Sequence, residues 1–133
     1  MSTSVRRLHL DADRLRAYSR RGNFHADPEE ARRLGLPGLV AQGMQVGAPA
    51  YGILLDAWGE DFLAHGALEW KFVGMVLEEE VVAAHVDVDA DLGADITDDD
   101  PGHGPTASIT VVSESTSRTV LVGTARQVAP SRL

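Results

Sequence analysis

The chain has 133 residues, of which 44% are hydrophobic, a formal net charge of −8 and no cysteine. This length suffices for one ordinary hydrophobic core, so we expect a single domain over residues 1–133. The lack of cysteine excludes disulfides, thiolate metal sites and thiol nucleophiles. The negative charge argues against nucleic acid, because phosphate backbones are bound by clustered Lys and Arg.

The N-terminal residues, MSTSVRRLHLDAD, contain no hydrophobic signal core. No apolar run approaches the roughly eighteen residues that a membrane helix requires. We therefore expect a cytoplasmic protein that does not associate with a membrane.

The charges are unevenly distributed along the chain. Residues 1–33 hold eight arginines against five acidic residues, whereas the remainder holds four basic and fifteen acidic residues. The arginines either solvate helices, or they receive the phosphates of a thioester carrier such as coenzyme A or dock an acidic carrier protein.

The first predicted elements are a short strand over residues 5–10 and a short helix that ends near Tyr18. Asp11 or Asp13 can cap this helix, and the Arg-Arg-Gly sequence at 20–22 breaks it.

A second helix has a strong start signal. Asp27 can act as N-cap, Pro28 suits the first helical position, and Glu30 stands where a capping-box acid reaches back to the cap. Gly35 is expected to end this helix. His25 is thus held two residues before a fixed helix start, which is the rigid mounting that a site residue needs.

The segment that begins at Gly43, GMQVGAPAYGILLDAW, is apolar on nearly every side, which predicts a long buried helix. Small residues at positions 47, 48, 50 and 52 would let strands approach it closely. Pro49 removes a helix hydrogen bond, so it either bends the axis or marks the true start of the helix.

Four strands are predicted after this helix, over residues 68–77, 80–89, 107–114 and 119–128. In the second, apolar residues alternate along residues 82–88 as in a half-buried strand. Residues 90–106 are typical of a surface loop and residues 115–118 of a hairpin turn. Helices followed by consecutive antiparallel strands predict an α+β domain, with one long helix against a curved sheet.

Several motifs resemble those of the MaoC-like hydratases and dehydratases, which have the hotdog fold. The family's His-x-Asp, followed after three residues by Ala, is present as His25-Ala26-Asp27 with Ala31. Its Ala-His-Gly-Met is present at 41–44 with Gln42 in place of the His, and its strand ending Arg-Phe-x-x-Pro-Val is similar to residues 70–76. Residues 119–128 are similar to its closing strand. The resemblance covers most of the chain.

The resemblance implies a long central helix wrapped by a curved antiparallel sheet, and water addition to or removal from an enoyl thioester. In the family an Asp and a His activate the water, and a glycine N–H steadies the thioester oxygen. By this resemblance His25 takes the acid/base role and Gly43 the oxyanion role. Asn23 or Gln42 is expected to donate a hydrogen bond beside His25. Gln42, with Arg20, Met44 and Tyr51, is expected to contact the substrate.

The chain departs from the family at the catalytic Asp, whose position five residues before the His is occupied by Arg20. An arginine cannot accept a proton at working pH. The family's Asn and Pro correspond to Gly22 and Asn23. A shifted alignment places Asn23 on the family's Asn, but the nearest preceding carboxylate is then Asp13.

Three readings of this departure remain open. The chain can be a degenerate subunit that completes a heteromer with an intact partner, or a binding protein for acyl groups. It can also be an enzyme with His25 as sole acid/base, which suffices for isomerisation, cyclisation or elimination on a polyketide-like intermediate. His25 can also bond backbone groups alone, and Asn23 can be a turn residue. We expect a homodimer, because the family builds its site between two protomers. We expect no metal ion or cofactor, because neither metal-ligand spacing nor a dinucleotide pattern is present.

Overall fold

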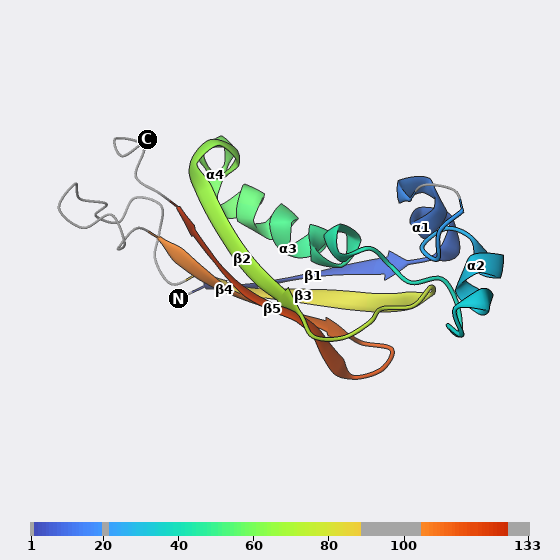
Figure 1. Cartoon of the computed structure of the whole chain (residues 1–133). Helices are drawn as coiled ribbons and strands as arrows, with labels where there is room; N and C mark the ends of the chain where they lie inside the picture. Colours follow the sequence, from blue (N-terminus) through green and yellow to red (C-terminus); the bar gives the residue numbers. More distant parts are fainter. Residues whose placement is uncertain (1, 20–21, 89–104, 128–133) are drawn as a thin grey trace.

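Five antiparallel strands form one sheet in the order β1-β3-β4-β5-β2. The computed structural model describes residues 2–19, 22–88 and 105–127. The elements in chain order are β1 (Ser2–Leu10), α1 (Ala12–Tyr18), α2 (Pro28–Arg33), α3 (Gly43–Trp58), α4 (Glu60–His65), β2 (Gly66–Phe72), β3 (Glu80–Val88), β4 (Thr106–Ser113) and β5 (Arg118–Gln127). The sheet curves around α3, with α1 and α2 at one end of the molecule and α4 at the other (Figure 1). The predicted α+β architecture is confirmed.

The core lies between α3 and the concave face of the sheet. Strand side chains alternate between the two faces, so every second residue of a strand faces the helix. The alternation predicted for residues 82–88 is confirmed, since Val82, Ala84 and Val86 of β3 are fully buried. Burying each valine or larger apolar side chain contributes about 1.5–3 kcal/mol, which makes this contact the main source of stability.

The long helix is not buried on all sides. Ala50, Leu54 and Trp58 face the sheet, but Met44 and Ala48 are exposed. The prediction of a helix buried all round is therefore wrong on one face, because a single sheet covers only one side of a helix. The helix runs without a break through Pro49, so its start is Gly43.

Two glycines of α3 make room for aromatic side chains of β2. A Cβ added to Gly43 would lie 2.6 Å from Cζ of Phe72, and a Cβ on Gly47 would overlap the ring of Trp70. The glycines are four residues apart on the helix, and the aromatic residues are two apart on the strand. Each pair therefore lies on one face of its element, and the two aromatic rings fill the two glycine positions.

Most of the predicted capping residues of α1 and α2 are confirmed. Asp11 caps α1 by accepting from the Arg14 N–H at 2.7 Å, and Asp27 caps α2 by accepting from the Glu29 N–H at 3.0 Å. Gly35 follows α2 with φ of 78°, a conformation that favours glycine. The capping-box role of Glu30 is wrong, because its carboxylate binds Arg33 of the same helix instead.

Several elements differ from the prediction. Helix α4 was not predicted, β1 begins at Ser2 rather than at residue 5, and β2 ends at Phe72 rather than at residue 77. The strand ends there because the N–H groups of Val73 and Gly74 both turn to the Val120 carbonyl. Most of the predicted loop 90–106 lies outside the described residues. Within the described ranges, no helix combines the length and apolarity needed to cross a membrane.

Candidate functional site

Three chain segments meet at the end of the sheet that carries α1 and α2. Residues 39–41 lie between residues 23–25 and residues 76–78. On one side the Val40 N–H donates to the Phe24 carbonyl at 3.3 Å, and on the other the Ala41 N–H donates to the Val76 carbonyl at 2.8 Å. Val40 and Leu77 also form an antiparallel bridge. The middle segment then leads directly into α3.

His25 is oriented by the backbone of this middle segment. Its Nδ1 lies 2.6 Å from the Val40 carbonyl oxygen, and the ring is half-buried. Because a carbonyl oxygen can only accept, Nδ1 carries the proton. In the neutral ring Nε2 is then unprotonated and able to accept a proton. The ring also packs against Phe24, with the ring centroids 4.1 Å apart.

Gly43 begins α3 three residues after Val40. Its N–H belongs to the first turn, where backbone donors have no partner within the helix. Gln42 is the N-cap but makes no capping hydrogen bond, and its Nε2 donates instead to Ser19 Oγ at 2.8 Å. The Gly43 N–H has no partner among the described residues. A free donor at a helix N-terminus favours a negatively charged oxygen.

Exposed apolar side chains lie at the start of α3 and in the segment after β2. Phe72 packs over the Cα of Gly43 and is 44% exposed, and Met44 beside it is 56% exposed. Val73 and Met75 are also about half exposed in the segment after β2. We call these four residues, Met44, Phe72, Val73 and Met75, the apolar rim. A rim of this kind suits an acyl chain or the apolar surface of a second subunit.

The side chains of Asn23 and Gln42 are partly occupied within the protein. The Asn23 Oδ1 accepts from the His25 N–H at 2.9 Å, and its carbonyl accepts from two further N–H groups. Asn23 thus makes the backbone contacts of a turn residue, which is the alternative role considered for it. Its Nδ2 has no partner among the described residues, so its donor role stays a prediction, as does that of Gln42.

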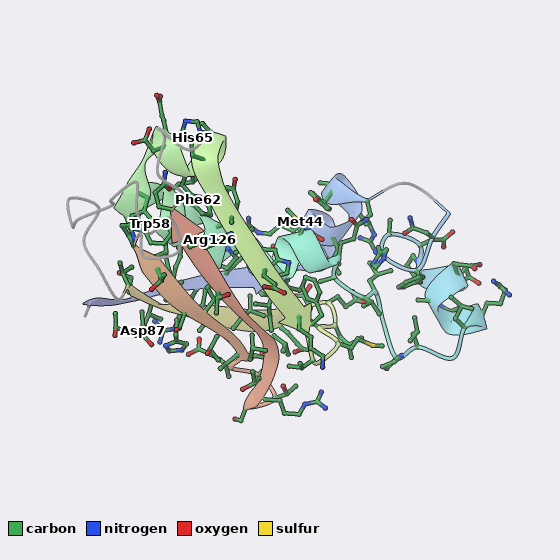
Figure 2. The ribbon with its side chains drawn as sticks, turned by 60° about the vertical axis from the view of Figure 1, so that its left-hand side comes forward. Met44, Trp58, Phe62, His65, Asp87 and Arg126 are labelled. Atoms are coloured by element: carbon green, nitrogen blue, oxygen red, sulfur yellow. The ribbon has the colours of Figure 1, made fainter. Side chains whose placement is uncertain are left out.

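The expected substrate contacts divide into two groups. Met44 lies at the same end as His25 and lines a surface groove of about 350 Å³ together with Leu8 and Tyr18. Tyr51 lies seven residues further along α3, about 10 Å at 1.5 Å per residue, and the centroid of its ring lies 5.5 Å from that of Phe62 in α4. Figure 2 shows Met44 apart from Phe62, which lies near Trp58 on the α4 side of the molecule. Arg20 lies outside the described residues.

The arginines of α1 and α2 are mostly paired. Arg32 binds Glu29 at 2.8 Å, and Arg33 binds Glu30. The hydrogen bond from Arg33 lowers the pKa of Glu30, and the same bond raises the pKa of Arg33. These pairs are the helix-solvating arrangement, and the expected binding of carrier phosphates stays a prediction.

Some residues of this site carry no signal in the sequence. The partner of His25 is a backbone carbonyl, which no side-chain motif reveals. The contact between Phe72 and Gly43 had a signal, because the spacing of the two glycines matches that of the two aromatic residues.

In the described ranges no three His, Asp or Glu side chains lie close enough together to hold a metal ion.

No protein-family model matches the sequence, and no curated protein is detectably similar to it. The similarity to solved structures is clear. The chain superposes on the (R)-hydratase from A. caviae involved in PHA biosynthesis with a TM-score of 0.69, 17% identity and coverage of 96% of this chain and 95% of that one. For the R-hydratase PhaJ1 from Pseudomonas aeruginosa the TM-score is 0.72, with 15% identity and coverage of 97% and 80%.

A third similar structure is the ChsH1–ChsH2 complex from Mycobacterium tuberculosis, with a TM-score of 0.67, 11% identity and 96% coverage of both chains. Identities this low show the fold alone. The chain has the hotdog fold, in which an antiparallel sheet wraps one long helix. It is the fold of the R-hydratases and MaoC-like dehydratases that the sequence motifs resemble.

Proposed function

We propose that the chain is a MaoC-like lyase of the hydratase or dehydratase type, or a related isomerase or cyclase. Its substrate is an acyl thioester or a polyketide-derived intermediate, carried by coenzyme A or an acyl carrier protein. The observation that supports this most strongly is the orientation of His25. Its Nδ1 donates to the carbonyl of Val40, which leaves Nε2 able to accept a proton. Val40 lies three residues before Gly43, whose N–H has no partner among the described residues.

In the hydration direction, His25 Nε2 takes a proton from water while the water oxygen bonds to the β-carbon of the enoyl thioester. The resulting imidazolium returns a proton to the α-carbon. The Gly43 N–H donates to the thioester oxygen as negative charge develops there. Dehydration runs the same steps in reverse. An isomerisation needs only the proton transfer and the oxyanion contact.

The sequence motifs and the fold support this proposal together. His25 and Gly43 match the family's acid/base and oxyanion positions, and R-hydratases are among the proteins with the same fold. Because Arg20 stands at the position of the family's catalytic Asp, the chain lacks a carboxylate at that position. This favours reactions that one acid/base can complete.

The test is hydration of a crotonyl thioester by the purified chain, followed as loss of the enoyl absorbance. His25→Ala should lower kcat by about 10²–10⁴-fold, the usual contribution of an acid/base group. His9→Ala is the matched control, because His9 lies exposed on β1, where it binds Glu79. Equal activity of His25→Ala and the wild type would contradict the proposal.

The second candidate is a subunit that completes a heteromer with an intact partner. The ChsH1–ChsH2 complex is a two-protein assembly with this fold, and β2 has no strand on its outer side among the described residues. In this case the isolated chain binds a crotonyl thioester without turnover. Activity then appears on addition of a subunit that carries the intact Asp-x-Asn-Pro-x-His motif, or in an Arg20→Asp variant of this chain.

A further inference from the structure

The carbonyl that orients His25 belongs to a peptide segment held from its other side by Glu78. The Glu78 N–H donates to the Leu39 carbonyl at 2.8 Å, and Glu78 Oε1 accepts from the Leu39 N–H at 3.0 Å. One residue therefore binds both backbone groups of Leu39. The next residue, Val40, is left with its N–H and carbonyl directed at Phe24 and His25.

The carboxylate of Glu78 fits closely against this segment. A Cβ added to Gly38 would lie 2.8 Å from Glu78 Oε1, so the carboxylate lies directly beside the backbone. Successive peptide groups of an extended segment point in opposite directions. The Val40 carbonyl shares its peptide group with the Ala41 N–H, which donates to the Val76 carbonyl at 2.8 Å. The two preceding peptide groups are held by Glu78, so a shift of this segment away from His25 would also disturb the bonds of Leu39 to Glu78.

Glu78 is itself held by the sheet. The next residue, Glu79, donates its N–H to the Leu10 carbonyl of β1 at 2.8 Å. The buried Glu80 accepts from the Leu77 N–H at 2.8 Å and from Ser113 Oγ of β4 at 2.5 Å. The turn that carries Glu78 is thus fixed to two strands, and the Glu78 side chain transmits that position to the segment beside His25.

We propose that Glu78 is a positioning residue that fixes the ring orientation and tautomer of His25 through Leu39 and Val40. Its side-chain oxygen acts as an acceptor for the Leu39 N–H, and its charge is not required. The consequence for turnover rests on the proposed role of His25, but the effect on the ring does not.

The test is the ¹⁵N NMR spectrum of the His25 ring in the full chain, which distinguishes the two neutral tautomers. The wild type should show the form protonated at Nδ1. Glu78→Ala removes the acceptor and should give a mixture of tautomers. Glu78→Gln keeps a side-chain oxygen and should restore the wild-type spectrum.

Two further variants make the result independent of stability. Asp11→Ala is the matched control, because it also removes a carboxylate that accepts one backbone N–H, but in α1. It should leave the His25 signals unchanged. Gly38→Ala displaces the Glu78 carboxylate without removing it and should reproduce the mixture, which keeps the test usable if Glu78→Ala does not fold.

A folded Glu78→Ala or Gly38→Ala variant with the wild-type His25 spectrum would overturn the proposal. So would a Glu78→Gln variant as altered as Glu78→Ala, because the charge would then be the cause. In the activity assay Glu78→Ala should lower kcat about tenfold with little change in KM, the scale of other supporting contacts. If the wild type shows no turnover, the proposed function fails while the NMR result still decides the role of Glu78.

Discussion

At the scale of single residues, His25 is held by a neutral carbonyl rather than by a carboxylate. The Val40 oxygen selects the protonated ring nitrogen and fixes the plane of the ring. It supplies no full negative charge to stabilise an imidazolium. The same site in the MaoC-like pattern pairs the His with an Asp, whose position here is Arg20. In the proposed mechanism His25 therefore acts as an oriented acid/base group without a carboxylate at that position.

The Gly43 N–H can be removed by a substitution for which the chain offers a matched control. Gly43→Pro deletes this donor at the first helical position, where proline is well tolerated, and Gln42 already has the extended conformation that precedes a proline. Gly43→Ala is the matched control, because it adds the same Cβ beside Phe72 but keeps the N–H. We expect kcat of the proline variant to be about 10²–10³-fold below that of the alanine variant.

Steady-state kinetics of both variants check this expectation. Equal kcat values would show that the Gly43 N–H does not contact the reacting oxygen. A loss shared by both variants would instead be due to the Cβ and its contact with Phe72.

The pair formed by Glu30 and Arg33 gives a pH-dependent prediction. The Arg33 hydrogen bond lowers the pKa of Glu30, so the ionised form is favoured in the folded chain. The stabilisation is therefore complete above the pKa of Glu30 in the unfolded chain and is lost as pH falls through its lower folded value. Because the pair is exposed to solvent, the effect on stability is small.

Arg33→Gln should raise the pKa of Glu30 toward its ordinary value, measured by ¹³C NMR titration of the side-chain carboxyl. Arg32→Gln is the control, because Arg32 pairs with Glu29. A Glu30 titration that is unchanged in Arg33→Gln would contradict the assigned cause.

At the scale of elements, the contact of α3 with β2 depends on Gly47. Gly47→Ala places a methyl group in the ring of Trp70, and we expect a loss of about 1–3 kcal/mol in the free energy of unfolding. Gly52→Ala in the same helix meets only the end of the Arg6 side chain, which can move. It should change stability by about 1 kcal/mol or less, since better helix propensity offsets the weakened surface pair of Arg6 with Asp56.

Urea unfolding of the two variants measures the difference. Equal stabilities would show that the Trp70 ring is not closely packed against the helix. A destabilised Gly52→Ala would show instead that the Arg6 side chain is held more firmly than a surface pair.

The elements with strong local signals could be predicted from the sequence. Asp27, Pro28 and Gly35 fix α2 through capping and turn conformations that depend on a few adjacent residues. Alternation fixed the face of β3 in the same way. The end of β2 could not be predicted, because it depends on a carbonyl of β5 that is remote in sequence.

The site was predictable only in part for the same reason. His25 and Gly43 were predicted as site residues from motifs, a prediction that stays open. Their local settings, before α2 and at the start of α3, follow from nearby residues. The contacts that connect them, from His25 to Val40 and from Leu39 to Glu78, are long-range backbone contacts. Such contacts are set by the packing of the sheet and leave no pattern of residue types.

At the scale of the whole molecule, one chain leaves apolar surface uncovered. The apolar rim lies at the end of β2 and the start of α3, and Ala48 extends the exposed apolar face along the helix. The outer side of β2 is an unpaired sheet edge within the described residues. These features support a second subunit that covers this side, either another copy or a related chain.

Met75→Glu tests this expectation in the purified chain. A charge placed in an apolar contact without a partner should weaken self-association roughly tenfold or more, measured by sedimentation velocity over a range of concentrations. Leu63→Glu is the control, because Leu63 is exposed on α4 away from the rim. A wild type that remains monomeric throughout would contradict the homodimer, and equal association of both variants would contradict the assigned surface.

The most direct measurement of the central claim is exchange of the α-proton of a 3-hydroxybutyryl thioester in D₂O, followed by ¹H NMR. Every reaction proposed for this site shares that step, in which His25 moves the proton and the Gly43 N–H steadies the oxygen. We predict exchange with the wild type, no exchange above background with His25→Ala, and slower exchange with Gly43→Pro than with Gly43→Ala. Exchange that persists in His25→Ala, or a wild type that shows none, would contradict the account.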